Sequence, residues 1–411
     1  MRKIMACLDV GSDAVKLVVG EMVKKKLNIL AVCETPSKGV NNGIVENPNL
    51  LIKSLEDVIQ KGEEVIGLRI KQLILSIPSN NASFAVVEGT VPIENEGNLI
   101  EGHDIIRVFQ KAIKSKLTDD LEYVSMMPTS FSLDDNRIVN DPKGLTSKEL
   151  TVRGVMVSTP KKNIYPILAC LERLKVDVLD IALDVIGDYF EFKEKELDKK
   201  IGAVVNLGAE TTTVAIFNKG VLTNVNVIDL GGKNIDNDIS FIYKVPGSVS
   251  KKLKENFALA HSKMASVNDV VEVEDKSSFK VNINQSEISE VVMSRLDEIL
   301  NLSKKEINHL TKKEISYIIF TGGLTESRDF KLILEEIYGR NAIVGTIKEI
   351  GARNNKYSSC IGLIKYYAYN SNLKNKDFSI FSIDEQQYLS GVNSDEQDGT
   401  LGKLFGYLFN G

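Results

Sequence analysis

Three side chains with complementary chemistry, Asp9, Ser12 and Lys16, surround a predicted tight turn near the start of the chain. Apolar residues before Asp9 predict a strand, and β-branched residues after the turn predict a second strand that runs back. A bend whose backbone N–H groups are exposed can bind an anion. Ser12 adds a hydroxyl, Lys16 adds a cation, and Asp9 adds a carboxylate that can hold Mg²⁺ through water. The stretch predicts either a phosphate-binding hairpin or an ordinary structural hairpin with the same turn.

An internal repeat of this pattern favours the phosphate-binding interpretation. Residues 203–217 repeat the pattern of strand, turn and strand. Asn206 stands two places before Gly208, just as Asp9 stands two places before Gly11. Such a repeat predicts two related halves that face one ligand.

A third motif follows later in the chain. Apolar residues 318–320 predict a buried strand that runs into a turn at Gly322 and Gly323, and helix-forming residues 329–338 come next. The order of hairpin, hairpin and strand–Gly-Gly–helix resembles that of the actin-like ATPase fold, an α/β fold.

Composition narrows the function classes. The 411 residues are enough for several subdomains, and a net charge of -5 without a dense basic cluster argues against nucleic acid as a partner. The three histidines have no ligand spacing. No signal peptide is expected, and no window reaches the roughly 18 apolar residues that span a bilayer. The cysteines have no CxxC spacing, so we expect small buried residues of a reducing cytosol at Cys7, Cys33, Cys170 and Cys360.

Changes in pattern along the chain predict several subdomains. Two core subdomains are each split by an insertion, and a linker and a tail follow. The expected parts are residues 1–82 with 163–200 (first core), 83–162 (an α+β insert), 201–230 with 313–369 (second core), 231–312 (a small, mostly helical subdomain), 370–398 (a flexible linker) and 399–411 (the tail).

The last residues have a helical apolar pattern behind the polar linker. Apolar side chains recur with the spacing of one helix face, which predicts an amphipathic helix. Such a helix could dock onto the body, bind a partner or lie in a membrane interface. The face consists of Leu401, Leu404, Phe405, Leu408 and Phe409.

Jointly, these features resemble the FtsA family, the actin-like bacterial division proteins that tie FtsZ filaments to the membrane. The resemblance covers nearly the whole chain. It implies two related ribonuclease-H-like halves around a nucleotide cleft, with an α+β insert in the first half in place of an actin subdomain. It is strongest at Leu8–Glu21, Pro36–Gly43, Ile201–Leu222, Leu230–Ser240, Phe320–Gly323 and the linker-plus-tail ending.

The resemblance also implies roles for individual residues. Without the family, Lys252 and Arg295 would be ordinary solvated helix charges. The implied assignments are Asp9 and Asn206 beside Mg²⁺-bound water; Gly11, Ser12, Asp13 and Lys16 in the first phosphate turn; Gly208, Ala209 and Thr211 in the second; Gly232 and Lys252 on the nucleotide side; Gly322 and Gly323 in the adenosine turn; and Arg295 in the subdomain that receives the FtsZ C-terminal peptide.

Four positions depart from the family pattern. Asn206 is neutral where the family usually has Asp, and Ala209 and Glu210 replace glycines of the second turn. Glu210 should repel phosphate oxygens. Val249 stands where Glu is common, which removes a hydrogen bond to ribose. We therefore expect ATP and Mg²⁺ to be bound weakly or not at all, no catalytic residue, and at most a slow ATPase.

The implied function is that of a cell-division adaptor. The expected partners are the FtsZ C-terminal peptide, further copies of the chain in a filament, the cytoplasmic face of the membrane at the division site, and other division proteins. Two alternatives remain: a pilus-assembly actin homologue of the PilM type, and a relative of sugar or acetate kinases.

Overall fold

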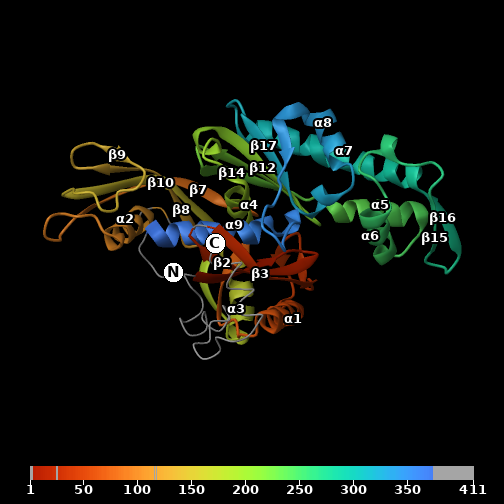
Figure 1. The fold of residues 1–411 in the computed structure, drawn as a ribbon, viewed down its shortest axis with the longest axis horizontal. Coiled ribbons are helices and arrows are strands. Elements are labelled where there is room, and N and C mark those ends of the chain that lie inside the picture. Colours follow the sequence, from red (N-terminus) through yellow and green to blue (C-terminus); the bar gives the residue numbers. More distant parts are fainter. Residues whose placement is uncertain (1–2, 25, 115, 117, 374–411) are drawn as a thin grey trace, which may run out of the picture.

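The computed structural model describes residues 3–24, 26–114, 116 and 118–373. Two five-stranded sheets form the centre of an elongated molecule (Figure 1). The first sheet consists of β1 (Lys3–Val10), β2 (Ala14–Val23), β3 (Lys26–Pro36), β6 (Gln72–Ile77) and β11 (Asp177–Leu183). The second consists of β12 (Ile201–Leu207), β13 (Thr212–Asn218), β14 (Val221–Ile228), β17 (Tyr317–Thr321) and β18 (Ala342–Val344).

The two sheets have the same topology. Their strand orders are β3-β2-β1-β6-β11 and β14-β13-β12-β17-β18. In each, the first three strands pair antiparallel and the last two join in parallel. β1 and β12 are apolar and buried along most of their length, as strands covered on both faces must be. This repeat confirms the predicted α/β fold with two related halves.

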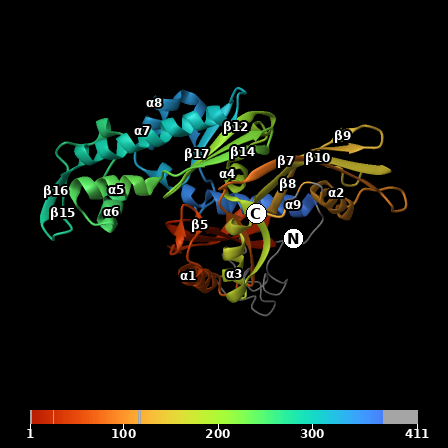
Figure 2. The same ribbon diagram turned by 180° about the vertical axis from the view of Figure 1, so that it is seen from behind.

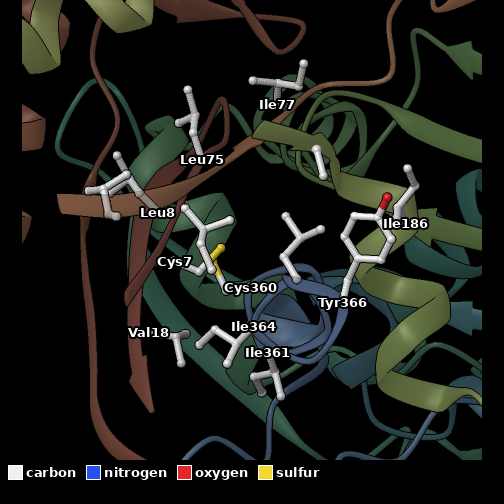
Figure 3. Close-up of a cluster of buried hydrophobic side chains, with 14 of the residues drawn as sticks. Cys7, Leu8, Val18, Leu75, Ile77, Ile186, Cys360, Ile361, Ile364 and Tyr366 are labelled. Atoms are coloured by element: carbon white, nitrogen blue, oxygen red, sulfur yellow. The ribbon is translucent and has the colours of Figure 1, made fainter. Parts of the chain in front are cut away.

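Two helices lie between the sheets. α9 (Ser358–Leu373) packs on β1, β2 and β6, and α4 (Asp184–Phe192) contacts β6, β11 and β12. Cys360, Ile361 and Ile364 of α9 face Cys7 and other apolar side chains of the first sheet (Figure 3). The helices that join the halves are therefore part of the same hydrophobic core.

Other helices cover the outer faces of the sheets. α1 (Pro48–Ile66) and α3 (Tyr165–Arg173) lie beside the first sheet (Figure 2), while α7 (Gln285–Leu310) and α8 (Phe330–Tyr338) pack on the second. α1 is capped at its N-terminus by Asn47, whose side chain accepts the N–H of Leu50, and at its C-terminus by Gly67, which has a φ of 72°.

Two smaller groups of elements occupy opposite ends of the molecule (Figure 1). One is an antiparallel sheet of order β7-β10-β8-β9 with a helix packed against it. Its elements are β7 (Ser83–Pro92), α2 (Gly102–Lys114), β8 (Leu121–Leu133), β9 (Ile138–Val139) and β10 (Glu149–Pro160). The other contains α5 (Gly232–Tyr243), α6 (Gly247–Asn256), β15 (Val270–Glu274), β16 (Lys280–Asn284) and the first turns of α7. The exact subdomain boundaries stay predictions.

One sequence expectation needs correction at the end of the body. The linker was expected from residue 370, but α9 continues to Leu373. Ser371 is buried, so the helix still packs on the body there and outweighs the polar composition of the segment. Residues 374–398 of the expected linker and the predicted tail residues Leu401, Leu404, Phe405, Leu408 and Phe409 lie outside the described residues.

The expected burial of the cysteines is confirmed. All four cysteines are buried free thiols.

Within residues 3–373, apart from the few positions left undescribed, no helix is both long and apolar enough to cross a bilayer.

Candidate functional site in the cleft between the halves

The two hairpins have matching turns. The N–H of Gly11 donates to the carbonyl of Ala14 at 3.1 Å, and the N–H of Gly208 donates to the carbonyl of Thr211 at 2.9 Å. In both β1 and β12 the polar residue two places before this glycine is only partly buried. The sequence echo therefore corresponds to a repeated local geometry.

Asp9 is engaged by two neighbours. It lies opposite Lys16 in the β1–β2 register, and the two form an ion pair of 2.8 Å through Oδ2. Its Oδ1 accepts the hydroxyl of Ser76 at 3.0 Å. Burial lowers the pKa of Lys16, but the charge and hydrogen bond of Asp9 outweigh it and hold that pKa above its ordinary value. Lys16 is therefore a fixed cation beside the first turn.

Asn206 has a different partner, which the sequence analysis missed. Its Nδ2 donates to Oδ2 of Asp188 at 2.6 Å, and the hydroxyls of Ser358 and Ser359 donate to Oδ1 at 2.6 and 2.8 Å. Asp188 is fully buried. Burial raises its pKa to about 6 despite these three donors. The available signal was an aspartate in the middle of helix 184–192, next to the apolar and aromatic residues Val185, Ile186 and Tyr189.

A second carboxylate, which is half-buried, lies one turn away on α4. Asp184 accepts the hydroxyl of Ser79 at 2.5 Å. Burial, followed by the nearby charge of Asp188, raises the pKa of Asp184 to about 7. Even so, the described residues contain no cluster of three or more histidine, cysteine or acidic side chains that could hold a metal ion.

Both carboxylate oxygens of Glu210 are bound by donors of the chain itself. Its Oε2 accepts the N–H of Asn42 at 2.7 Å, and its Oε1 accepts from Nζ of Lys233. Asn42 belongs to the turn between β4 (Val40–Asn41) and β5 (Ile44–Val45) of the first half. Glu210 therefore connects the two halves directly.

The start of α5 packs onto the second turn. The N–H of Gly232 donates to the carbonyl of Gly208 at 3.0 Å, and that of Lys233 to the carbonyl of Ala209 at 2.7 Å. A Cβ on Gly231 would lie 2.7 Å from the Ala209 carbonyl oxygen. The amide groups at this helix start are thus used within the protein.

The lysines of α6 lie on different sides of the helix. Lys251 pairs with Asp13 of the first turn at 2.7 Å. Lys254, one turn later, contacts the Gly232 carbonyl at 3.0 Å and Asp236 at 2.9 Å. Lys252 is exposed, so its neighbours make the cleft contacts. Residues three apart share a helix face, and Lys252 points elsewhere.

The Gly-Gly turn after β17 approaches the second hairpin closely. Gly322 has a φ of +93°, and a Cβ there would lie 2.4 Å from Oδ1 of Asn206 and from the Leu207 carbonyl oxygen. Only glycine fits this position. Gly323 has more room, with Cβ of Lys356 the nearest atom at 3.8 Å. Val249, the other predicted departure, is half-buried against the core of the second half.

A separate groove lies between α5 and α7 around Arg295. It encloses about 440 Å³. Phe241 and Ile242 in its wall are 85% and 52% exposed, which is unusual for large apolar side chains. Arg295 is held by Asp238, with Nε–Oδ2 at 2.7 Å and Nη2–Oδ1 at 3.0 Å, and by Glu298.

Matches to known families follow the two parts of this architecture. The family described as "Cell division protein FtsA" matches residues 203–362, and "SHS2 domain inserted in FTSA" matches residues 80–158. Cell division proteins FtsA from several bacteria also align over most of the chain. The chain belongs to the FtsA family.

Two bacterial FtsA relatives illustrate the extent of the match. The FtsA of Bacillus subtilis (strain 168) is 25% identical over 377 residues, covering 91% of this chain and 86% of the relative. The FtsA of Streptococcus pneumoniae serotype 2 is 25% identical over 362 residues, covering 87% of this chain and 79% of the relative.

Solved structures share the fold. The PilM–PilN type IV pilus biogenesis complex matches with a TM-score of 0.58 at 13% identity, covering 87% of this chain and 97% of that chain. MreB5 of Spiroplasma citri bound to ADP matches with a TM-score of 0.53 at 11% identity, covering 91% and 99%. At such low identity these likenesses confirm the actin-like fold class and nothing further.

In this cleft, several groups that could hold a nucleoside triphosphate with Mg²⁺ already have partners within the chain. The carboxylate of Glu210 uses donors beside both phosphate turns, and the first amides of α5 are bonded to carbonyls. Asp9 is paired with Lys16, and Asn206 with Asp188. A phosphate or metal ion at these groups would have to replace those contacts.

Proposed function

We propose that this FtsA-family chain is a cell-division adaptor. It binds the C-terminal peptide of FtsZ, assembles with further copies into actin-like filaments, and tethers the division ring to the cytoplasmic face of the membrane through its tail. Its cleft binds ATP weakly or not at all. The exposed apolar groove between α5 and α7 is the observation that carries this proposal.

The groove suits a short amphipathic peptide. Phe241 and Ile242 offer apolar surface, and the walls add four carboxylates (Asp238, Glu287, Glu290 and Glu298) against the single guanidinium of Arg295. Four negative charges and one positive charge give the groove a formal charge of -3, and Arg295 is already paired with Asp238 and Glu298. A bound peptide should therefore place Lys or Arg beside its apolar residues.

The test is Phe241→Ala, measured as binding of a fluorescent FtsZ C-terminal peptide by anisotropy. Burying a phenylalanine contributes about 1.5–3 kcal/mol, so the dissociation constant should rise about 10- to 100-fold. Added salt should weaken binding to the wild type.

Phe279→Ala is the matched control. Phe279 is also highly exposed, at 71%, but lies next to β16 outside the groove. Both variants should keep wild-type stability, because neither side chain is buried. Equal peptide affinity of the Phe241→Ala and Phe279→Ala proteins would contradict the proposal.

A further inference from the structure

The carboxylate of Glu210 joins the tips of the two hairpins. Asn42 of the first half donates its N–H at 2.7 Å and Lys233 of the second half donates its ammonium group, while nearby Ser12 helps to lower the pKa of this carboxylate. Only 8% of the Glu210 side chain is exposed. One buried anion of the second phosphate turn therefore connects it with the β4–β5 turn of the first half.

These donors are the kinds that a phosphate group takes. Backbone N–H, hydroxyl and lysine ammonium groups all form charge-assisted hydrogen bonds with compact anions, whether carboxylate or phosphate. Burial alone raises the pKa of Glu210, but Lys233 and the Asn42 amide outweigh it and leave the pKa below its ordinary value. Glu210 is thus an anion at neutral pH.

The donors are also held in place. Asn42 has a φ of +48°, and its carbonyl accepts Nδ2 of Asn80 at 3.2 Å. The next amide, that of Gly43, donates to Oγ of Ser12 at 2.8 Å. Ser12 therefore accepts from the same turn whose preceding amide donates to Glu210, and these contacts fix the turn beside the carboxylate.

A second ion pair spans the same gap. Lys251 of α6 contacts Asp13 of the first turn, with side chains 39% and 50% exposed. Such an exposed pair contributes little by itself. It nevertheless joins the same two halves beside Glu210. Charged side chains of the chain itself therefore link the two halves at this point.

We propose that Glu210 is the chain's own substitute for the terminal phosphate of a nucleotide. Its carboxylate occupies the phosphate donors of both halves, holds the cleft closed, and competes with a nucleoside triphosphate for those donors. The inference rests on the proposed function only in taking a nucleoside triphosphate as the ligand of the cleft. Simple repulsion would predict only that removing the carboxylate improves triphosphate binding. The inference predicts in addition that its removal loosens the contact between the two halves.

Two variants of the full chain test this. Glu210→Gln keeps the size of the side chain and removes its charge, and Glu210→Gly frees the space. Titration with a fluorescent ATP analogue and Mg²⁺ should give at least about tenfold tighter binding for both variants than for wild type, the equivalent of one charge-assisted hydrogen bond. Without nucleotide, amide hydrogen exchange in residues 38–47 should become about tenfold faster.

Glu274→Gln is the control, because Glu274 is exposed on β15 far from the hairpin tips in the sequence and in contact with β16. It should match wild type in both measurements. The inference is overturned if wild type and both variants bind the analogue equally, or all fail to bind it, or if exchange in residues 38–47 is unchanged. If the glycine variant does not fold, the glutamine variant decides. The groove test with the FtsZ peptide is independent of these outcomes.

Discussion

Asp9 and Asn206 occupy the same place in two equivalent strands, yet their side chains have different kinds of partner. Asp9 is paired with Lys16 on the neighbouring strand, while Asn206 donates to a carboxylate that comes from α4. The acid near the second turn is therefore Asp188, fully buried and held by neutral donors. A neutral residue in the strand has not removed negative charge from this side of the cleft.

Two acids of α4, half-buried Asp184 and buried Asp188, should make stability depend on pH. Burial raises the pKa of Asp184 to about 7, so the folded chain holds this proton more tightly than the unfolded chain does. The resulting stabilisation is complete below the unfolded pKa near 3.9 and is lost as the pH rises through about 7. Asp188 acts in the same direction.

Asp184→Asn should remove this loss. The wild type should lose roughly 2 kcal/mol of unfolding free energy between pH 5 and pH 8 through Asp184, and the variant should not. Urea unfolding at several pH values measures the difference. Asp297→Asn, at an exposed position of α7, is the control and should follow wild type. Parallel curves for wild type and Asp184→Asn would refute the assignment.

At the scale of elements, the crossing of α4 and α9 fixes how the halves are joined. Both helices have a glycine where they meet: a Cβ on Gly362 would lie 1.7 Å from the Gly187 carbonyl oxygen, and one on Gly187 would lie 2.1 Å from that of Ser359. The backbones are therefore in direct contact. Asp188 and Ser359 meet at the same crossing, so close packing also brings the buried carboxylate to its donors.

Gly362→Ala should be strongly destabilising. The added methyl group cannot fit without moving a backbone, and overpacking of this kind costs about 1–3 kcal/mol or more. Urea unfolding of the full chain measures the loss. In the control, Gly247→Ala at the start of α6, a new Cβ meets nothing within 4 Å. That variant should stay within about 1 kcal/mol of wild type. A similarly small effect at Gly362 would mean that the helices can separate.

At the scale of the whole molecule, contacts between the halves are spread along the cleft. Glu210 and Lys251 meet the first half near the hairpin tips, while Glu34 of β3 pairs with Lys356 at 2.7 Å and accepts the hydroxyl of Tyr357 at 3.1 Å. The two halves are therefore joined by side-chain contacts both at the hairpin tips and at β3.

Deleting residues 401–411 should release the protein from liposomes in a flotation assay. Each immersed apolar side chain contributes at most about 1.5–3 kcal/mol, and ordering a short helix offsets part of this, so one tail is a weak anchor. A filament raises the effective concentration of tails and binds firmly. Phe405→Glu should act like the deletion.

The truncated protein should still bind the FtsZ peptide, because the groove between α5 and α7 belongs to the body. This measurement shows that the truncated chain is folded. Unchanged flotation of the truncated protein would count against the tail as the membrane anchor.

The sequence by itself determined the repeated hairpins, the Gly-Gly turn and the α/β class. These depend on local patterns: apolar runs make buried strands, and Gly11, Gly208 and Gly322 mark turns wherever they occur. The end of α9 was misjudged because packing of Ser371 and its neighbours overrode a polar composition.

Only the tertiary structure decided which charges meet. Glu210 was expected to repel phosphate, but Asn42 lies 168 residues away in the sequence and no local pattern predicts that its amide holds this carboxylate. Likewise the choice of Lys251 and Lys254 over Lys252 depends on how α6 is turned toward the cleft, and the partner of Asp188 depends on the helix crossing. Local sequence sets which donors and acceptors exist, and long-range packing sets which of them satisfy each other.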